Sequence, residues 1–255
     1  MEFVGLGGFK MSEIKNEHKK YGKAILFSLL IENKIEDLCE EYKIKPTNGK
    51  KLNFHEKIDR LYKSKVVIKS MFEKEYGSGN ELKLKKYNKK LDKYEEKMHE
   101  RYDELKKWRK KRNELVHDDY IAFSNNEEFK VFLNECKELV DFFDIETIKE
   151  YNDAKLVAIG KLVYMSTFVE KHIDEKCENR NINIYDEARK RKPFYVKVDE
   201  ILMTKHKKTK KYEDMKVWWS KRSIILHSLS ELQTTSTTDI ESFINEINEW
   251  LNIEL

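Results

Sequence analysis

The chain has 255 residues, of which only two are proline and eight are glycine. Residues that form turns are too scarce to punctuate a fold of many strands, and the abundance of lysine, glutamate and leucine is typical of long helices. We therefore expect an all-α protein. The net charge of +4 excludes a chain that is strongly basic throughout, but local basic clusters remain. Such clusters suit a polyanionic partner or, as the alternative, form a solvated surface.

The cysteines and the apolar runs exclude several other classes. Cys39, Cys136 and Cys177 are odd in number and show no CxxC spacing, which argues against a disulfide framework or a zinc site and favours reduced, buried thiols. The longest apolar run, residues 24–31, is too short to span a bilayer. Residues 1–10 lack the features of a signal peptide. We expect a cytoplasmic protein with no cofactor, no metal and no membrane partner.

The first half of the chain, residues 12–150, predicts four helices. Apolar residues recur at helical spacing over residues 21–38, Asn53 is placed to cap a second helix, and residues 77–80 turn the chain. A third helix leads to residue 117, and a fourth ends near residue 142. The third helix has an apolar stripe with steps of three and four residues, made of Leu84, Tyr87, Leu91, Tyr94, Met98, Tyr102, Leu105 and Trp108.

The second half, residues 151–255, repeats this plan. We expect helices over residues 147–177, 194–203, 211–229 and 238–251, with Thr147 placed to cap the first of them.

Four ordered blocks of matching residues relate the two halves. At an offset of 138, Gly22, Ser28, Glu32, Ile35 and Cys39 match Gly160, Ser166, Glu170, Ile173 and Cys177. At an offset of 140, Phe54, Lys57 and Asp59 match Phe194, Lys197 and Asp199. At an offset of 110, Trp108, Lys111, Arg112 and His117 match Trp218, Lys221, Arg222 and His227. At an offset of 111, Phe132, Asn134 and Glu135 match Phe243, Asn245 and Glu246.

We interpret these matches as a duplication, with copy one at residues 12–150 and copy two at residues 151–255. The fall of the offset from 140 to 110 leaves about 30 extra residues in copy one, enough to lengthen a helical hairpin by roughly 20 Å. This predicted hairpin arm covers about residues 62–104. We expect the two four-helix modules to pack as a pseudo-two-fold pair, because one small helical module buries little apolar surface alone.

Two Arg-x-x-x-x-His motifs stand at matched positions: Arg112, Asn113 and His117 in copy one, and Arg222, Ser223 and His227 in copy two. Residues four apart share a helix face, so the residue after each arginine is placed to contact the histidine. Arg112 also continues the apolar stripe, where a cation must face an anionic or polar group. The structural alternative is a core histidine and an arginine that is paired with a carboxylate.

The two motifs resemble the signature of the HEPN superfamily, a group of small helical domains that includes many ribonucleases. That signature is Arg-x4–6-His, often with Asn after the Arg, which Arg112, Asn113 and His117 match; Ser223 departs from it. The resemblance covers both halves in helix layout and motif position. It extends to abortive-infection proteins and to the paired nuclease domains of RNA-guided CRISPR effectors.

The resemblance implies a metal-independent endoribonuclease, in phage defence or as a toxin, with a composite site between two facing modules. One histidine would accept the proton of a ribose 2′-OH, and the other would protonate the leaving 5′-oxygen. The two arginines would clamp the phosphate, and Asn113 and Ser223 would orient the imidazoles. Which histidine is the base stays open. The alternative is a non-catalytic module that binds RNA or protein.

Basic residues near the motifs and in the loop of copy two are the expected RNA contacts: Arg109, Lys110, Lys111, Lys205, Lys207, Lys208, Lys210 and Lys211. The expected substrate is RNA, single-stranded or tRNA-like. An antitoxin, a sensor, an associated RNA and a second copy of the chain are left open as partners.

Overall fold

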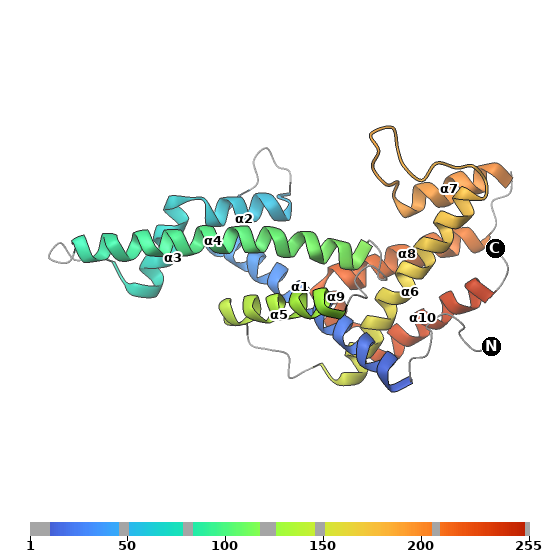
Figure 1. The fold of residues 1–255 in the computed structure, drawn as a ribbon, viewed down its shortest axis with the longest axis horizontal. Helices are drawn as coiled ribbons and strands as arrows, with labels where there is room; N and C mark the ends of the chain where they lie inside the picture. The colour runs from blue at the N-terminus through green and yellow to red at the C-terminus, as the bar shows by residue number, and fades with distance from the viewer. Residues whose placement is uncertain are drawn as a thin grey trace. The chain divides into compact units, whose positions relative to one another are not determined.

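The computed structural model describes residues 11–45, 51–78, 84–117, 126–145, 151–205 and 210–252. The architecture is all-α, as predicted, and the longest described connection, residues 179–193, joins α6 to α7 (Figure 1). In copy one the helices are α1 (Met11–Glu41), α2 (Phe54–Tyr62), α3 (Lys65–Tyr76), α4 (Leu84–His117) and α5 (Asn126–Phe142). In copy two they are α6 (Asp153–Glu178), α7 (Phe194–Lys205), α8 (Lys210–His227), α9 (Leu229–Thr234) and α10 (Thr237–Asn252).

Local hydrogen bonds decide where the helices of copy one begin. Asn53 caps α2 as predicted: its side chain accepts from the Glu56 backbone N–H, and the Glu56 carboxylate accepts from the Asn53 N–H. The expected single second helix is instead divided, because the Ser64 side chain accepts from the Val67 N–H and begins α3. The described residues of copy one therefore form five helices rather than the expected four.

Two boundaries of copy two also differ from expectation. The expected cap Thr147 lies outside the described residues, and α6 begins at Asp153, where Asn152 accepts from the backbone N–H of Lys155. After His227 the chain forms a short extra helix, α9, which the Ser228 hydroxyl caps through the Glu231 N–H. A serine next to a helix end is thus enough to start another helix within one residue.

The chain forms two compact units, which we describe separately. Unit 1 comprises residues Met1–Leu29, Glu114–Leu133 and Thr147–Leu255, and unit 2 comprises Leu30–Asn113 and Asn134–Glu146. This division cuts across the duplication, since unit 1 takes all of copy two together with segments of copy one.

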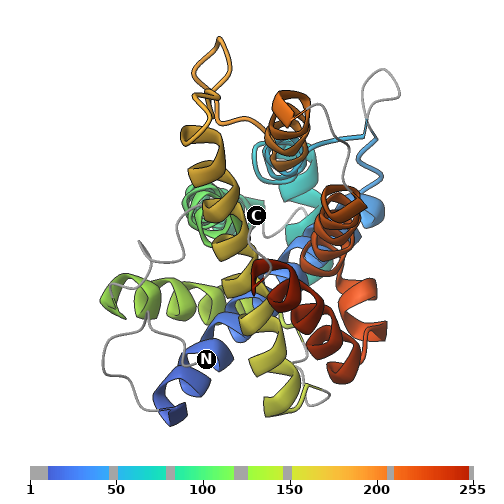
Figure 2. The same cartoon turned by 90° about the vertical axis from the view of Figure 1, so that its right-hand side faces the viewer.

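Unit 1 is organised around α6, whose buried residues run from Leu156 to Cys177. Helices α7, α8 and α10 pack against it, and the N-terminal part of α1 crosses it (Figures 1 and 2). At the crossing, a Cβ on Gly22 would lie 2.7 Å from the carbonyl carbon of Leu156. A Cβ on Gly160 would lie 2.8 Å from the Cα of His18. Glycine at both positions therefore lets the two backbones touch.

This crossing is reciprocal with respect to the duplication. Gly22 matches Gly160 at the offset of 138, and the same offset relates His18 to Leu156. The Gly22–Leu156 contact and the Gly160–His18 contact are therefore the same contact with the roles of the two helices exchanged. Contacts around a two-fold axis have this property. The reciprocity concerns the first helix of each copy, and the pairing of the complete modules stays a prediction.

Unit 2 contains the predicted hairpin arm, formed by α3 and the first part of α4. The Phe72 ring lies 5.2 Å from that of Tyr87 and 5.5 Å from that of Tyr94, measured between centroids, and the Tyr87 hydroxyl donates to Glu73. The apolar stripe of α4 is buried from Met98 to Trp108, half-buried from Tyr87 to Tyr94, and exposed at Leu84. The predicted apolar stripe is therefore at least half-buried at every position except Leu84.

Equivalent residues of the two copies also share local geometry. The hydroxyls of Ser28 and Ser166 are buried and donate to the carbonyls four residues earlier. Lys43 and Asn181, which match at the offset of 138, end α1 and α6 with φ of 53° and 56°. The next N–H donates to the carbonyl of Cys39 in copy one and of Cys177 in copy two, which is a Schellman cap in both.

Candidate active site

Arg112 lies on the buried face of α4, one turn after Trp108. Its residue is 0% exposed, and its Nε is 3.2 Å from Oε1 of Glu32 on α1. A cation on the apolar stripe therefore faces an anion, as the pattern predicted. Burial lowers the pKa of the Arg112 guanidinium to about 10, so the side chain still carries its charge at neutral pH.

Arg109, one turn earlier on α4, shares this carboxylate. Its guanidinium forms an ion pair with Glu32 and lies 4.9 Å from the centroid of the Phe54 ring. Burial, with a smaller contribution from the like charge of Arg112, lowers the pKa of Arg109 to about 10. Two guanidiniums of α4 therefore lie against the same carboxylate of α1.

The rest of the copy-one motif lies at the end of α4. Asn113 is exposed, and its Oδ1 accepts a long hydrogen bond of 3.5 Å from the Arg112 guanidinium. Asn113 thus contacts the motif arginine, and its predicted contact to His117 stays a prediction. His117 is the last residue of α4, and its side chain lies outside the described residues.

The copy-two motif has a different environment. Arg222 is 1% exposed, and its guanidinium carbon is 4.6 Å from the centroid of the Trp219 ring. That ring stacks on Phe194 with 4.0 Å between centroids. Because Trp219 matches Arg109 and Phe194 matches Phe54, an aromatic pair replaces the arginine–aromatic pair of copy one. Ser223 and His227 are half-buried, and His227 is the last residue of α8.

Both motif tryptophans are buried in the core. Trp108 is 1% exposed, and its indole N–H points to the Cys136 sulfur at 3.3 Å. Trp218 is 1% exposed and donates to the backbone carbonyl of Phe243 at 2.9 Å. Cys136, like Cys39 and Cys177, is a buried free thiol, which confirms the prediction from cysteine number and spacing.

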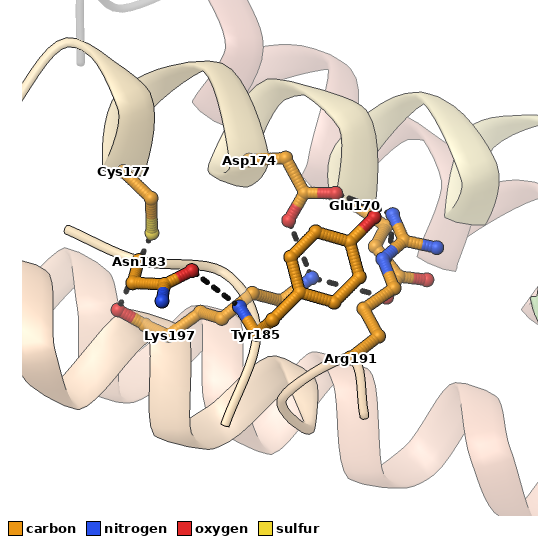
Figure 3. Close-up of polar contacts among 7 residues, drawn as sticks. All are labelled: Glu170, Asp174, Cys177, Asn183, Tyr185, Arg191 and Lys197. Carbon is orange, nitrogen blue, oxygen red and sulfur yellow. Dashed lines mark hydrogen bonds and ion pairs between the residues drawn. The ribbon is translucent and has the colours of Figure 1, made fainter. Parts of the chain in front are cut away.

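A buried ion cluster in copy two was not foreseen from the sequence. Lys197 has a fully buried ammonium group, 2.5 Å from Oδ1 of Asp174 and 3.2 Å from Oε1 of Glu170 (Figure 3). Arg191 pairs with the other oxygen of Asp174. The repeat could have indicated this pair, because Lys197 and Asp174 match Lys57 and Glu36, which also form an ion pair in copy one.

The predicted RNA-binding residues fall into three groups. Lys110 and Lys210 are exposed, as a solvent-facing contact requires. Arg109 and Lys111 are engaged within the fold, Lys111 through Glu135 at 2.7 Å. The side chains of Lys205 and Lys211, together with Lys207 and Lys208, lie outside the described residues.

Two further features bear on the chemistry of this region. The last turn of α4, residues 114–117, belongs to the same compact unit as α8 and His227. Among the residues that the structure describes, no group of three or more His, Cys, Asp or Glu is arranged to hold a metal ion. None of the described helices has an apolar stretch that is long enough to cross a bilayer.

Comparison of the chain with protein-family models, with curated proteins and with solved structures finds no match in any of the three.

Proposed function

We propose that the chain is a metal-independent endoribonuclease whose active site combines the two Arg/His motifs. One observation carries the proposal: the motifs occupy equivalent positions on duplicated helices, with both arginines buried and both histidines at the helix end. Arg112 and Arg222 are 0% and 1% exposed, and His117 and His227 close α4 and α8.

The proposed reaction needs no group beyond these side chains and the RNA. One imidazole accepts the proton of a ribose 2′-OH as its oxygen attacks the neighbouring phosphorus. The bond from phosphorus to the 5′-oxygen breaks, and the second imidazole donates a proton to that oxygen. The products are a 2′,3′-cyclic phosphate and a free 5′-OH, so atoms and charge balance.

The surroundings of Arg112 support its part in the proposed site. Arg109 and Arg112 both form ion pairs with Glu32, which holds two guanidiniums, the groups best suited to bind a phosphate, beside the motif. The neighbouring residue Asn113 is exposed and accepts a long hydrogen bond from the Arg112 guanidinium.

The second candidate is a non-catalytic module that binds RNA or protein, and a specific observation favours it. Arg112 has a carboxylate partner, and Arg222 stacks on Trp219. Both arginines thus have interactions within the fold, which a purely structural role also requires. Only an assay of cleavage separates this alternative from the proposed nuclease.

The experiment incubates the purified full chain with total RNA in the presence of EDTA and identifies the ends of the products. We expect cleavage with 2′,3′-cyclic phosphate ends, and RNA that carries 2′-O-methyl groups should resist. His227→Ala should abolish cleavage, since one of the two proton-transfer groups is lost. His99→Ala is the matched control, because His99 is exposed on α4 and has no part in the proposal.

Two results would reject the nuclease. A folded His227→Ala protein that cleaves at the parent rate would rule out this mechanism, and products with a free 3′-OH would require another chemistry. If the proposal holds, expression should arrest growth through RNA cleavage, as expected of a toxin or a phage-defence protein, and His227→Ala should relieve that arrest.

A further inference from the structure

The first three turns of α4 carry a dense row of lysines on the outer side of the hairpin arm. Residues 85, 89 and 93 follow one another at four-residue spacing, and 86 and 90 form a second row beside them. Successive lysines of a row are about 6 Å apart along the helix. All five side chains are exposed, and we call them the lysine face: Lys85, Lys86, Lys89, Lys90 and Lys93.

The lysine face has few acidic neighbours in its own helix segment. Within residues 84–94 the one acidic residue is Asp92, and Glu95 and Glu96 follow directly. Among the described residues, no carboxylate forms an ion pair with any of the five lysines. On the facing helix, the Glu73 carboxylate accepts from the Tyr87 hydroxyl at 2.7 Å, and Glu75 hydrogen-bonds with Tyr76 and Tyr94. Like charges at four-residue spacing destabilise a helix by roughly 0.2–0.5 kcal/mol a pair, and a bound anion would relieve that repulsion.

The apolar side chains of the same helix segment pack against α3. Tyr87 and Tyr94 contact the ring of Phe72 on α3, so the apolar side of the segment faces its hairpin partner. A helix that binds in a membrane interface needs an exposed apolar face opposite its charges. The lysine face therefore fits a hydrophilic polyanion better than a lipid surface.

An exposed aromatic ring lies beside the lysines. Tyr76, the last residue of α3, is 57% exposed, and Nζ of Lys90 is 5.8 Å from the centroid of its ring. The Tyr76 ring also packs against the rings of Phe72 and Tyr94, whose centroids are 5.0 Å and 6.2 Å away. A fixed aromatic ring next to cations is the combination that binds single-stranded nucleic acid, by stacking on bases and by attracting phosphates.

We propose that the lysine face and Tyr76 form a docking surface for single-stranded RNA, in which the lysines contact phosphates and the Tyr76 ring stacks on a base. The proposal rests on the proposed function, because it takes RNA as the substrate. Copy two has no counterpart, since α7 ends at Lys205 and α8 begins at Lys210. The arm is therefore an addition to one copy that enlarges the RNA-binding surface beyond the motif region.

The test measures binding of the full chain to a short single-stranded 2′-O-methyl RNA, which cannot be cut by 2′-OH attack, over a series of salt concentrations. The variant Lys85→Gln/Lys89→Gln/Lys93→Gln removes one row. If each lysine neutralises one phosphate, the slope of log K against log salt should fall by roughly two. We expect affinity near 0.1 M salt to weaken by about tenfold or more.

The matched control removes the same charge elsewhere. Lys65→Gln/Lys137→Gln/Lys171→Gln changes three exposed lysines on α3, α5 and α6 and should leave the salt slope within error of the parent. A second variant, Tyr76→Leu, keeps an apolar side chain against Phe72 but removes the aromatic ring, and should weaken binding with no change of slope.

Three outcomes overturn the docking surface. Equal losses in the two triple variants would show an effect of net charge alone. Unchanged binding by the first triple variant, in a parent protein that still cleaves RNA, would refute the arm and leave the proposed nuclease standing. Binding to phosphatidylserine vesicles that depends on the three lysines, without any effect on RNA, would assign the surface to a membrane.

Discussion

The reciprocal crossing of α1 and α6 predicts an unusual response to glycine-to-alanine substitution. In an ordinary helix interior this change stabilises by about 1 kcal/mol, because alanine is the better helix former. At Gly22 the new methyl group would lie 2.7 Å from the Leu156 carbonyl carbon, and at Gly160 it would lie 2.8 Å from the His18 Cα. Both obstacles are backbone atoms, which cannot rotate away as a side chain can.

The size of the effect follows from the displacement that the methyl group requires. The helices must separate by roughly an ångström to restore ordinary contact distances, and overpacking of this kind costs about 1–3 kcal/mol. Since α6 is buried along its length, we take the upper part of that range. After the gain in helix propensity is subtracted, Gly22→Ala should destabilise by about 2 kcal/mol and lower Tm by about 4–8 °C.

The assay is equilibrium unfolding in urea of Gly22→Ala, Gly160→Ala and the double variant, with Ser220→Ala on the exposed face of α8 as a control. Each single variant should lower the urea midpoint with little change in the m-value. The double variant should lose clearly less than the sum of the two, because the first substitution has already separated the same pair of helices. Additive losses, or any stabilisation by Gly22→Ala, would refute the shared crossing.

Two further predictions concern buried charge. Burial lowers the pKa of His18 to about 4 from an ordinary 6.5, so the folded state binds fewer protons than the unfolded state between these values. The free energy of unfolding should therefore be highest above pH 6.5 and fall by up to about 3 kcal/mol as the pH drops toward 4. Urea titrations at several pH values should show that His18→Gln, unlike His99→Gln, reduces this pH dependence. Lys197→Met should destabilise by about 3 kcal/mol because Glu170 and Asp174 lose a buried cation; a change below 1 kcal/mol, measured in the same way, would show that Arg191 suffices.

The sequence predicts the helical class, the arm and the buried anchors because these depend on local patterns. Trp108 and Trp218 stand at equivalent places in equivalent stripes, and both are buried. The break between α2 and α3 could not be read in the same way. Apolar residues keep helical spacing across it, from Ile58 to Phe72, and only the hydrogen bond of the Ser64 hydroxyl distinguishes a new helix from a continued one.

The sequence selects the candidate residues of the motifs, but it does not predict their contacts. The position of Arg112 on an apolar stripe requires an anionic or polar partner, yet nothing in the local sequence selects Glu32, which lies 80 positions earlier. Lysines pose the same problem. Lys111 pairs with Glu135, whereas Lys93 has no ion pair among the described residues, and composition treats the two alike. Tertiary contacts decide which basic residues are available to a ligand.

The two copies differ most in the residues that surround the motif arginines. Equivalent buried serines and helix caps keep their geometry. The indole N–H groups of Trp108 and Trp218 meet different acceptors, and Arg109 of copy one is replaced by Trp219 in copy two. The matched carboxylates also differ in use: Glu32 pairs with Arg112, and Glu170 pairs with Lys197. The motif arginine therefore lies against a carboxylate in copy one and against an aromatic ring in copy two. If the proposed nuclease is correct, its two half-sites are not interchangeable.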